Sequence, residues 1–252
     1  MEKVKPFLYA LGDHITLIDT MEGGRRGRTG CYVINGEQSA IIETGTSYGI
    51  PFILAGIKEL KINPEQVRYI VVTHIHLDHS GGVGSILPHF PNATIVVHRR
   101  GARHLVDPSR LIIGARSIYG GDLEKIFGEI LPVPEERVLV REDGDTLTLG
   151  NGRVLTFYDT PGHAKHHFSI LDSVSKGIFT GDTVGNRYVK EYTGLDFEFI
   201  FPATSPSDFD KNALLSSIAK LEKLDAKKIF HGHFGVTEPV KRKTCDVNCR
   251  KI

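Results

Sequence analysis

Histidines gather in three short segments of this chain. The chain has 252 residues and 12 histidines. Eight of the histidines occupy only 14 positions: His74, His76, His79, His163, His166, His167, His231 and His233. Random placement would put roughly 0.7 histidines there. Because histidine is the commonest metal ligand and titrates near neutral pH, the clustering predicts a metal or proton-transfer site. The other four histidines are isolated and are interpreted as structural or surface residues: His14, His89, His98 and His104.

The first cluster lies in the segment VVTHIHLDHSGG, residues 71–82. Its potential ligands follow at i, i+2, i+4 and i+5: His74, His76, Asp78 and His79. This spacing matches neither one helix face nor one strand face throughout. The segment is therefore predicted to be a loop whose backbone wraps around a metal site. Four nitrogen and oxygen ligands in six residues could nearly fill one tetrahedral zinc site or seed two sites.

Three later segments supply further candidate ligands, each directly after an apolar strand pattern. They are His163 in DTPGH, Asp182 in TGDT, and His233 in HGH, where His231 is an alternative to His233. Strand ends are places where a rigid scaffold presents functional side chains. A catalytic metal site built from these segments also needs an open position for water.

The surrounding pattern predicts an α/β protein with two halves. In the first half, strands are expected at 14–20, 31–35, 39–43, 68–73 and 94–97, and helices at 50–60 and 82–90. In the second half, strands are expected at 137–141, 145–149, 153–159, 168–172, 177–181 and 227–231, and a helix at 207–223. Each half begins as a meander and continues as strand–helix units, which predicts two sheets packed face to face under outer helices. Residues 1–252 are interpreted as a single domain, in which 99–135 could cap the site as a lid and 237–252 is a tail.

In these motifs and their order, the chain resembles the metallo-β-lactamase superfamily and, within it, the glyoxalase-II-like and lactonase-like group. The resemblance runs from the strand before Gly45 to His233. It implies an αβ/βα four-layer sandwich, with two facing mixed β-sheets and outer helices. It also implies two divalent metal ions. Zinc is the preferred metal, and iron and manganese are the alternatives. One metal would be held by His74, His76 and His163 and the other by Asp78, His79 and His233, with Asp182 as the bridge.

The chain departs from the family pattern at two places. Many relatives have Asp-Thr-Gly where this chain has Glu43-Thr44-Gly45, and that aspartate usually supports the histidine loop. After Pro-Gly-His, relatives often continue with a small residue and glycine, whereas this chain continues with residues 164–167, AKHH. Because relatives have Gly-His at the last ligand position, His233 is preferred to His231.

The resemblance implies a dinuclear metal-dependent hydrolase of an ester-like bond, a thioester or a lactone, that uses a metal-bound hydroxide. Asp78 could also accept a proton or orient the nucleophile. One alternative is an iron-dependent oxidoreductase similar to persulfide dioxygenases, with iron on His74, His163 and Asp182. Two less favoured alternatives are a phosphodiesterase or nuclease, and a non-catalytic binding module stabilised by metal.

Residues that could touch the substrate are Tyr188, Tyr192 and His166, although buried or loop tyrosines are the simpler interpretation. The loop at residues 24–30 carries three arginines: Arg25, Arg26 and Arg28. We expect a solvated loop there, with recognition of an anionic substrate group as the alternative.

Composition narrows the classes of partner and of cellular compartment that we expect for this chain. Lys plus Arg (31) nearly balances Asp plus Glu (30), which argues against nucleic acid and favours a small-molecule substrate. No apolar run approaches the roughly 18 residues of a membrane helix, and no secretion signal is evident. Three cysteines cannot form a disulfide framework, which favours a reducing, cytoplasmic compartment. The oligomeric state, with a homodimer as one option, and the roles of Cys245 and Cys249 stay open.

Overall fold

Seven strands form the first sheet of the computed structural model, which describes residues 4–205 and 208–238. Their order in the sheet is their order in the chain: β1 (Leu8–Ala10), β2 (Ile15–Asp19), β3 (Gly30–Ile34), β4 (Ser39–Ile42), β5 (Val67–Val71), β6 (Thr94–His98) and β7 (Val138–Arg141). Strands β1 to β4 are antiparallel neighbours, whereas β4 to β7 run parallel. Parallel neighbours need crossover connections, and helices supply them here.

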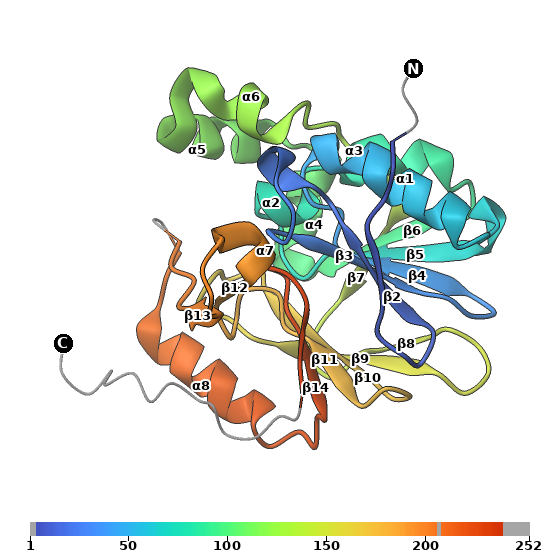
Figure 1. The fold of residues 1–252 in the computed structure, drawn as a ribbon. Coiled ribbons are helices and arrows are strands. Elements are labelled where there is room, and N and C mark those ends of the chain that lie inside the picture. Colours follow the sequence, from blue (N-terminus) through green and yellow to red (C-terminus); the bar gives the residue numbers. More distant parts are fainter. Residues whose placement is uncertain (1–3, 206–207, 239–252) are drawn as a thin grey trace.

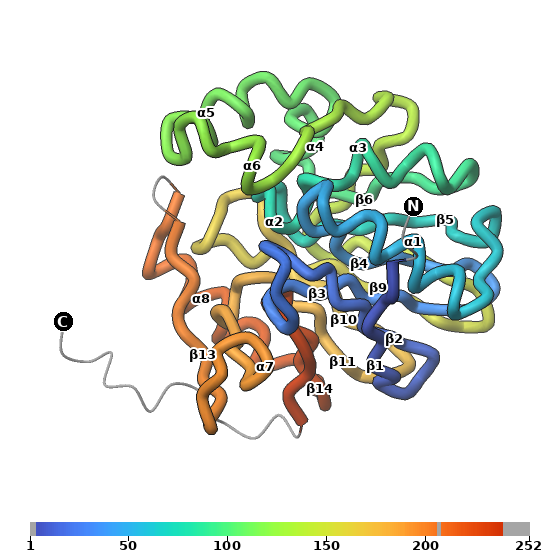
Figure 2. Tube along the Cα trace, turned by 45° about the horizontal axis from the view of Figure 1, so that its top comes forward, coloured from blue at the N-terminus to red at the C-terminus, as the bar shows by residue number. Residues whose placement is uncertain are grey.

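The crossover helices of the first half cover the outer face of the first sheet and reach beyond its edge (Figure 1). They are α1 (Ile50–Glu59), α2 (Leu77–Ser80), α3 (Val83–Ile86), α4 (Arg99–Val106), α5 (Ser109–Tyr119) and α6 (Leu123–Phe127). Figures 1 and 2 agree that α5 and α6 lie above α2, at the same end of the molecule. The segment 99–135 is therefore mostly helical, and its role as a lid stays a prediction.

The second sheet has six strands in the order β15-β14-β11-β10-β9-β8. Their bounds are β8 (Thr146–Thr148), β9 (Val154–Asp159), β10 (Phe168–Asp172), β11 (Gly177–Phe179), β14 (Lys228–Phe230) and β15 (Val236–Thr237). Among the described strands of this sheet, only β11 and β14 pair in parallel, and helix α8 (Lys211–Leu221) lies in the connection between them. The same connection carries α7 (Lys190–Thr193) and a separate two-stranded sheet of β12 (Asn186–Tyr188) and β13 (Phe199–Phe201).

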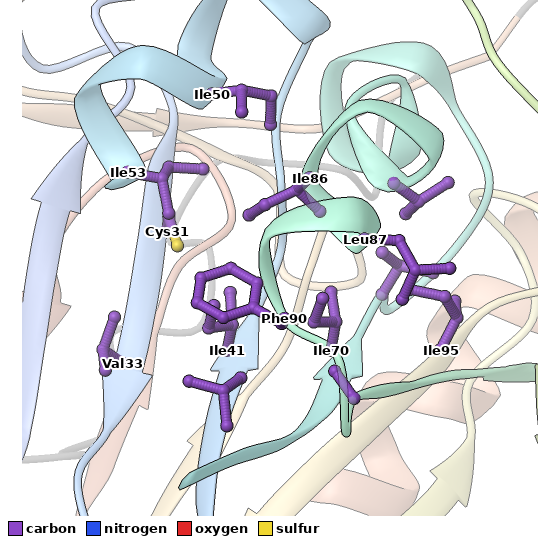
Figure 3. Close-up of a cluster of buried hydrophobic side chains, with 14 of the residues drawn as sticks. Cys31, Val33, Ile41, Ile50, Ile53, Ile70, Ile86, Leu87, Phe90 and Ile95 are labelled. Atoms are coloured by element: carbon purple, nitrogen blue, oxygen red, sulfur yellow. The ribbon is translucent and has the colours of Figure 1, made fainter. Parts of the chain in front are cut away.

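Alternate residues of the first sheet enter two different layers of the core, as the two-residue period of a strand requires. Cys31 and Val33 of β3 pack toward α1, against Ile50 and Ile53 (Figure 3). Their neighbours Tyr32 and Ile34 face the second sheet, where they meet its apolar side chains: Leu155, Phe157, Phe168, Ile170, Phe179 and Phe230. Both faces of the first sheet are thus covered, and two sheets with outer helices form the expected sandwich.

Proline and capping explain two helix boundaries. The helix expected at 82–90 is divided into α3 and a 3-10 turn at Leu87–His89, because Pro88 cannot continue α-helical hydrogen bonding. Helix α8 begins later than the expected residue 207, because the Asp210 side chain caps it by accepting the N–H of Ala213 at 3.0 Å.

Other expectations about the elements need correction. The strand expected at 137–141 in the second half is β7, which pairs with β6 and therefore belongs to the first sheet. Four short strands have no counterpart among the predicted elements: β1, β12, β13 and β15. The tail expected at 237–252 begins inside β15, and the rest of it from residue 239, with Cys245 and Cys249, lies outside the described residues. Within the described part of the chain, no helix combines the length and apolarity needed to span a membrane.

Candidate metal centre

The seven predicted ligands come together where strand ends of both sheets meet. His74 follows β5, His76 immediately precedes α2, and α2 itself carries Asp78 and His79. The second sheet supplies the other three, from the β9–β10 loop, the end of β11 and the β14–β15 loop: His163, Asp182 and His233. Their ligand atoms form three overlapping groups, in each of which all atoms lie within 4.8 Å: His74 with His76 and His163, His74 with His79 and Asp182, and Asp78 with His79 and His233.

The first group is an arrangement of three histidine nitrogens. Nδ1 of His76 lies 3.1 Å from Nε2 of His74 and 2.8 Å from Nε2 of His163. Metal–nitrogen distances of about 2.0–2.1 Å at a tetrahedral ion separate its ligand atoms by roughly 3.3 Å. The three rings therefore converge at close to the spacing that a single metal ion requires.

The carboxylate of Asp182 stands between the two sides of the centre. Its Oδ2 lies 3.4 Å from Nε2 of His163, which belongs to the first group. Its Oδ1 lies 3.2 Å from Nε2 of His79 and 3.4 Å from Nε2 of His233, which belong to the second side. Each oxygen thus faces a different set of histidines.

Asp78 completes the second side from a more open position. Its Oδ2 lies 3.5 Å from Nε2 of His233 and 3.8 Å from Nε2 of His79. The Asp78 side chain is 27% exposed, whereas that of His79 is 1% exposed. Asp78 is therefore the ligand of this side that lies nearest to solvent.

Three buried ligand atoms test whether a cation fits this centre. Within the described part of the chain, Nε2 of His79, Oδ1 of Asp182 and Nε2 of His233 have no hydrogen-bond partner. Buried polar atoms are seldom left without a partner, because the loss of hydration is not repaid. A divalent cation would satisfy all three at once, and this nitrogen and oxygen donor set suits zinc, iron or manganese.

The ligand histidines are held by their far ring nitrogens. Nδ1 of His163 donates to the carbonyl of Ala203 at 3.0 Å, and Nδ1 of His74 lies 3.0 Å from Oγ1 of Thr73. Nδ1 of His79 lies 3.4 Å from Oε2 of Glu43. With the proton on the anchored nitrogen, the other nitrogen of each ring presents a lone pair to the centre.

Glu43 supports the histidine loop from the position at which many relatives have aspartate. Its backbone has φ 68°, and its side chain is buried. Oε1 accepts the backbone N–H of Thr73 at 3.1 Å, while Oε2 approaches His79. The left-handed backbone and the longer side chain together bring the carboxylate to both ends of the loop.

His167 is a positioning residue, which the sequence places in a histidine cluster without giving it a definite role. It is fully buried, and its Nε2 accepts the backbone N–H of Asp182 at 3.1 Å. Its Nδ1 lies within hydrogen-bond distance of the hydroxyls of Thr160 and Thr183. The pair His166-His167 after Pro-Gly-His was the available signal, but the residue pattern alone could not say which member meets Asp182.

Burial and charge divide the histidines into two electrostatic classes. Burial, with His163 nearby, lowers the pKa of His76 to about 4, so this ring is neutral at pH 7. Burial also works against a charged His233, but the carboxylates of Asp182 and Asp78 outweigh it and raise the pKa of His233 to about 10. The two carboxylates thus draw positive charge to this point, which a divalent cation supplies in place of the proton on His233.

His231 lies outside all three ligand groups. It is fully buried, and its Nε2 lies 2.7 Å from Oγ1 of Thr237. Burial, with Arg187 nearby, lowers the pKa of His231 to about 3. A neutral ring held by a hydroxyl fits a structural role, and the geometry favours His233 over it as a ligand.

The three candidate substrate residues all lie beside the centre. The His166 ring meets the His76 ring edge to face, with centroids 5.4 Å apart. Tyr188 and Tyr192 line a cavity together with the ligand His233. Of the three arginines of the 24–30 loop, Arg25 and Arg28 lie over the Tyr192 ring, whereas Arg26 pairs with the hydroxyl of Tyr9. The loop is thus tied to other elements rather than simply solvated.

Known proteins are similar to this chain over the part that carries all seven candidate ligands. The family model described as the Metallo-beta-lactamase superfamily matches residues 24–233. The metallo-beta-lactamase fold-containing protein ST1585 of Sulfurisphaera tokodaii is 27% identical over 82% of this chain and 73% of its own length. The N-acyl homoserine lactonase AttM of Azorhizobium caulinodans is 33% identical over 71% of this chain and 63% of its own length.

Solved structures show the same fold. The crystal structure of ST1585, from Sulfolobus tokodaii, superposes with a TM-score of 0.69 and 26% identity, over 84% of this chain and 77% of that one. A B3 metallo-beta-lactamase with an active site glutamic acid superposes with a TM-score of 0.66 and 20% identity, over 95% of this chain and 85% of that one. The sandwich, the order of the ligand segments and the match over residues 24–233 agree, and this chain belongs to the metallo-β-lactamase superfamily.

Proposed function

We propose that this protein is a dinuclear metal-dependent hydrolase that cleaves an ester-like bond, a thioester or a lactone, in a small-molecule substrate. The observation that carries the proposal is the position of Asp182. One of its oxygens lies 3.4 Å from His163 and the other lies 3.2 Å from His79, so the carboxylate can be shared by two metal ions. Seven ligands for two metals leave coordination positions open for water and substrate, which a purely structural site does not need.

The residues divide between two metal positions. His74, His76 and His163 would hold one ion, and Asp78, His79 and His233 the other, with Asp182 between them. Bound there, two divalent ions supply Lewis acidity and lower the pKa of a coordinated water toward neutrality. The far ring nitrogens of three ligands are held by neighbouring groups: that of His74 by Thr73, that of His79 by Glu43 and that of His163 by Ala203. These contacts fix the positions of the nitrogens that would face the metal ions.

Asp78 is the ligand best placed to handle a proton. Burial works against its charge, but His79 and His233 hold the pKa of this carboxyl well below its usual range. Its carboxylate is therefore ionised at neutral pH and can orient an attacking water by accepting a hydrogen bond. His166, whose pKa burial and His76 lower to about 3, stays neutral and can exchange hydrogen bonds with a substrate oxygen.

The lactone option draws support from the relatives. The AttM protein of Azorhizobium caulinodans bears the name N-acyl homoserine lactonase and is similar over 71% of this chain. A lactone and a thioester present the same electrophilic carbonyl, so a single centre can attack either. The identity of 33% leaves the pocket residues free to differ, and the acyl portion must be tested separately.

A substrate panel with metal removal tests the proposal. We expect the purified protein to hydrolyse at least one thioester or lactone of the panel, to lose this activity on chelation, and to regain it with zinc, iron or manganese. An Asp182→Ala variant, checked for folding by circular dichroism, should stay inactive after metal addition. Hydrolysis that survives chelation would contradict the proposal, as would one bound iron per chain with substrate-dependent O₂ uptake.

A further inference from the structure

A small cavity lies beside the ligand His233, and its other wall residues belong to none of the three ligand groups. Its volume is about 70 Å³, and its walls are Arg28, Asn186, Arg187, Tyr188, Tyr192 and His233. The walls come from three segments that are far apart in the chain: the β2–β3 loop, the adjacent β12 and α7, and the β14–β15 loop. Three of these side chains have planar polar ends: Arg28, Asn186 and Arg187.

Arg28 is oriented by a buried carboxylate. Its Nε lies 3.2 Å from Oε1 of Glu22, a residue that is 4% exposed and that also accepts the hydroxyl of Thr29 at 2.6 Å. The guanidinium also lies 5.9 Å from the centre of the Tyr192 ring. Within the described residues, its two terminal nitrogens make no hydrogen bond. Arg28 is therefore held in place while most of its donors stay available.

Arg187 is fixed in the same manner from the other wall. Its Nη1 donates to the carbonyl of Phe234 at 3.1 Å, directly after the ligand His233, and its Nη2 donates to Oε2 of Glu198 at 2.6 Å. The Arg187 side chain is 18% exposed. Pairing with one carboxylate each fixes the planes of both arginines. Arg28 offers its terminal nitrogens for bidentate recognition of an oxyanion, whereas each terminal nitrogen of Arg187 already donates once and keeps one N–H for a ligand.

Asn186 adds an independent sign that a polar ligand belongs here. Its Oδ1 is buried and, within the described residues, has no hydrogen-bond partner. An unsatisfied buried amide in the wall of a cavity needs an explanation. An ionised carboxylate or phosphate only accepts hydrogen bonds, so it would meet the NH2 of this amide, turned about its last side-chain bond, and not Oδ1.

A contact beside the cavity joins two of the elements that form it. Nη2 of Arg25 donates to the carbonyl of Tyr192 at 2.7 Å, and its guanidinium lies 4.7 Å from the centre of that ring. This contact links the arginine loop to α7. The arrangement is therefore built into the fold rather than formed by one mobile side chain.

We propose that this cavity binds a small oxyanion of the substrate, a carboxylate or a phosphate, next to the bond that is cleaved. The inference rests on the proposed hydrolase function, because it assigns the cavity to the same substrate. A single buried water needs about 10–15 Å³ of cavity volume, so a cavity of about 70 Å³ has room for a small polar group such as a carboxylate or a phosphate. Pockets for whole drug-sized ligands are several times larger, about 300–1,000 Å³.

Matched substrates test the inference in the metal-loaded protein. The 4-nitrophenyl monoester of glutaric acid ends in a carboxylate, and the ester of 5-methylhexanoic acid carries an isopropyl group of similar shape in its place. We expect kcat/KM to favour the glutarate ester at least tenfold in the unaltered protein, and this preference to fall at least tenfold in Arg28→Met. Arg28→Lys, which keeps the charge without the fork, should recover only part of it.

Arg26→Met is the matched control. It removes one arginine of the same loop, but Arg26 pairs with Tyr9 and does not line the cavity. Calorimetric titrations with glutarate and with inorganic phosphate provide a readout besides activity and distinguish the two oxyanions. The tighter binder should lose at least tenfold in affinity in Arg28→Met and keep its affinity in Arg26→Met.

Failure of this inference differs from failure of the proposed function. If both esters are hydrolysed equally and Arg28→Met leaves the ratio and the anion affinities unchanged, the oxyanion site is wrong and the hydrolase proposal stands. If neither ester nor any thioester or lactone is hydrolysed, the hydrolase proposal fails. The titrations then still test oxyanion binding, and equal affinities in Arg28→Met and Arg26→Met would overturn it.

Discussion

Oε2 of Glu43 lies 3.4 Å from Nδ1 of His79, and both side chains are buried. The other oxygen of the same carboxylate accepts the backbone N–H of Thr73 at 3.1 Å. One side chain thus ties the start of the histidine loop to the ring of its last ligand. Glu43 performs this function from a left-handed backbone with φ 68°. The substitution of glutamate for the family's usual aspartate therefore keeps the support behind the metal ligands.

Neutralising Glu43 should weaken the second metal position. Glu43→Gln keeps the shape of the side chain but removes the charge that orients His79 and makes it a better ligand. We expect metal affinity to fall about 10–100-fold, measured by competition with a chromogenic chelator. Glu43→Asp tests the reach of the side chain, and its metal affinity should lie between those of the unaltered protein and Glu43→Gln. An unchanged affinity in Glu43→Gln would show that Glu43 is only a packing residue.

Removing the shared ligand should be more damaging than removing its supports. Asp182→Ala should abolish metal uptake and turnover, and His76→Ala should do the same through the first group. We expect losses in kcat of more than about a hundredfold, beyond the 10–100-fold range of residues that act behind a ligand. Elemental analysis and initial rates check this on variants with unchanged circular dichroism spectra. A His76→Ala variant that stays fully active would contradict the ligand assignment.

A methyl group at Gly232 should disturb the centre sterically. A Cβ there would lie 2.8 Å from Cε1 of His79 and 3.2 Å from Cα of Gly181, so the His79 ring or the Asp182 loop must move. We expect Gly232→Ala to cost about 1–3 kcal/mol of unfolding free energy and to lower kcat about a hundredfold. Gly114→Ala is the control, because a Cβ at that exposed position in α5 would meet nothing within 4 Å. Equal behaviour of the two variants would rule out the steric account.

The buried ion pair of Arg153 and Asp172, which are not metal ligands, should make the free energy of unfolding depend on pH. Nε and Nη2 of Arg153 donate to the two oxygens of Asp172 at 2.8 and 2.6 Å, and both residues are buried. Burial opposes the charge of Asp172, but Arg153 and Ser175 outweigh it and lower the pKa of this carboxyl. The contribution is therefore present above the unfolded pKa of about 3.9 and is lost as the pH falls through the lower folded pKa.

Asp172→Asn tests this dependence. It should cost about 3–5 kcal/mol of unfolding free energy at pH 7, because it leaves the buried Arg153 without its charge partner. The difference from the unaltered protein should shrink below about pH 4, as followed by urea unfolding at pH 7, 5 and 3.5. Asp225→Asn removes a pair with Lys227 in which Asp225 is 89% exposed, and it should cost less than about 1 kcal/mol. A pH-independent difference for Asp172→Asn would be inconsistent with the linkage.

Local patterns were sufficient for the elements and the ligand loops that depend on neighbouring residues. The short β-branched segment at residues 31–35, between Gly-rich turns, predicts β3, and the continuous apolar run before His74 predicts β5. The spacing of His74, His76, Asp78 and His79 predicts a loop around a metal ion, and the structure brings all four beside His163, Asp182 and His233.

Contacts between distant segments could not be predicted in this way. The pairing of β7 with β6 depends on how residues 99–135 cross over, which no local pattern encodes. Strand β13 escaped prediction because all of Phe199–Phe201 is exposed and shows no alternation. Arg28 was interpreted as a loop residue because its position beside Tyr192 depends on the tertiary fold. The left-handed backbone of Glu43 is likewise unusual for its residue type.

Metal counting tests the central claim most directly. The protein should be purified without added metal and then loaded with zinc, iron or manganese in separate portions, and bound metal should be measured by elemental analysis against protein concentration. The shared position of Asp182 predicts two ions per chain, together with hydrolysis of a thioester or lactone in the loaded protein. A single iron per chain with O₂ uptake, or no bound metal in a folded and active protein, would contradict the account.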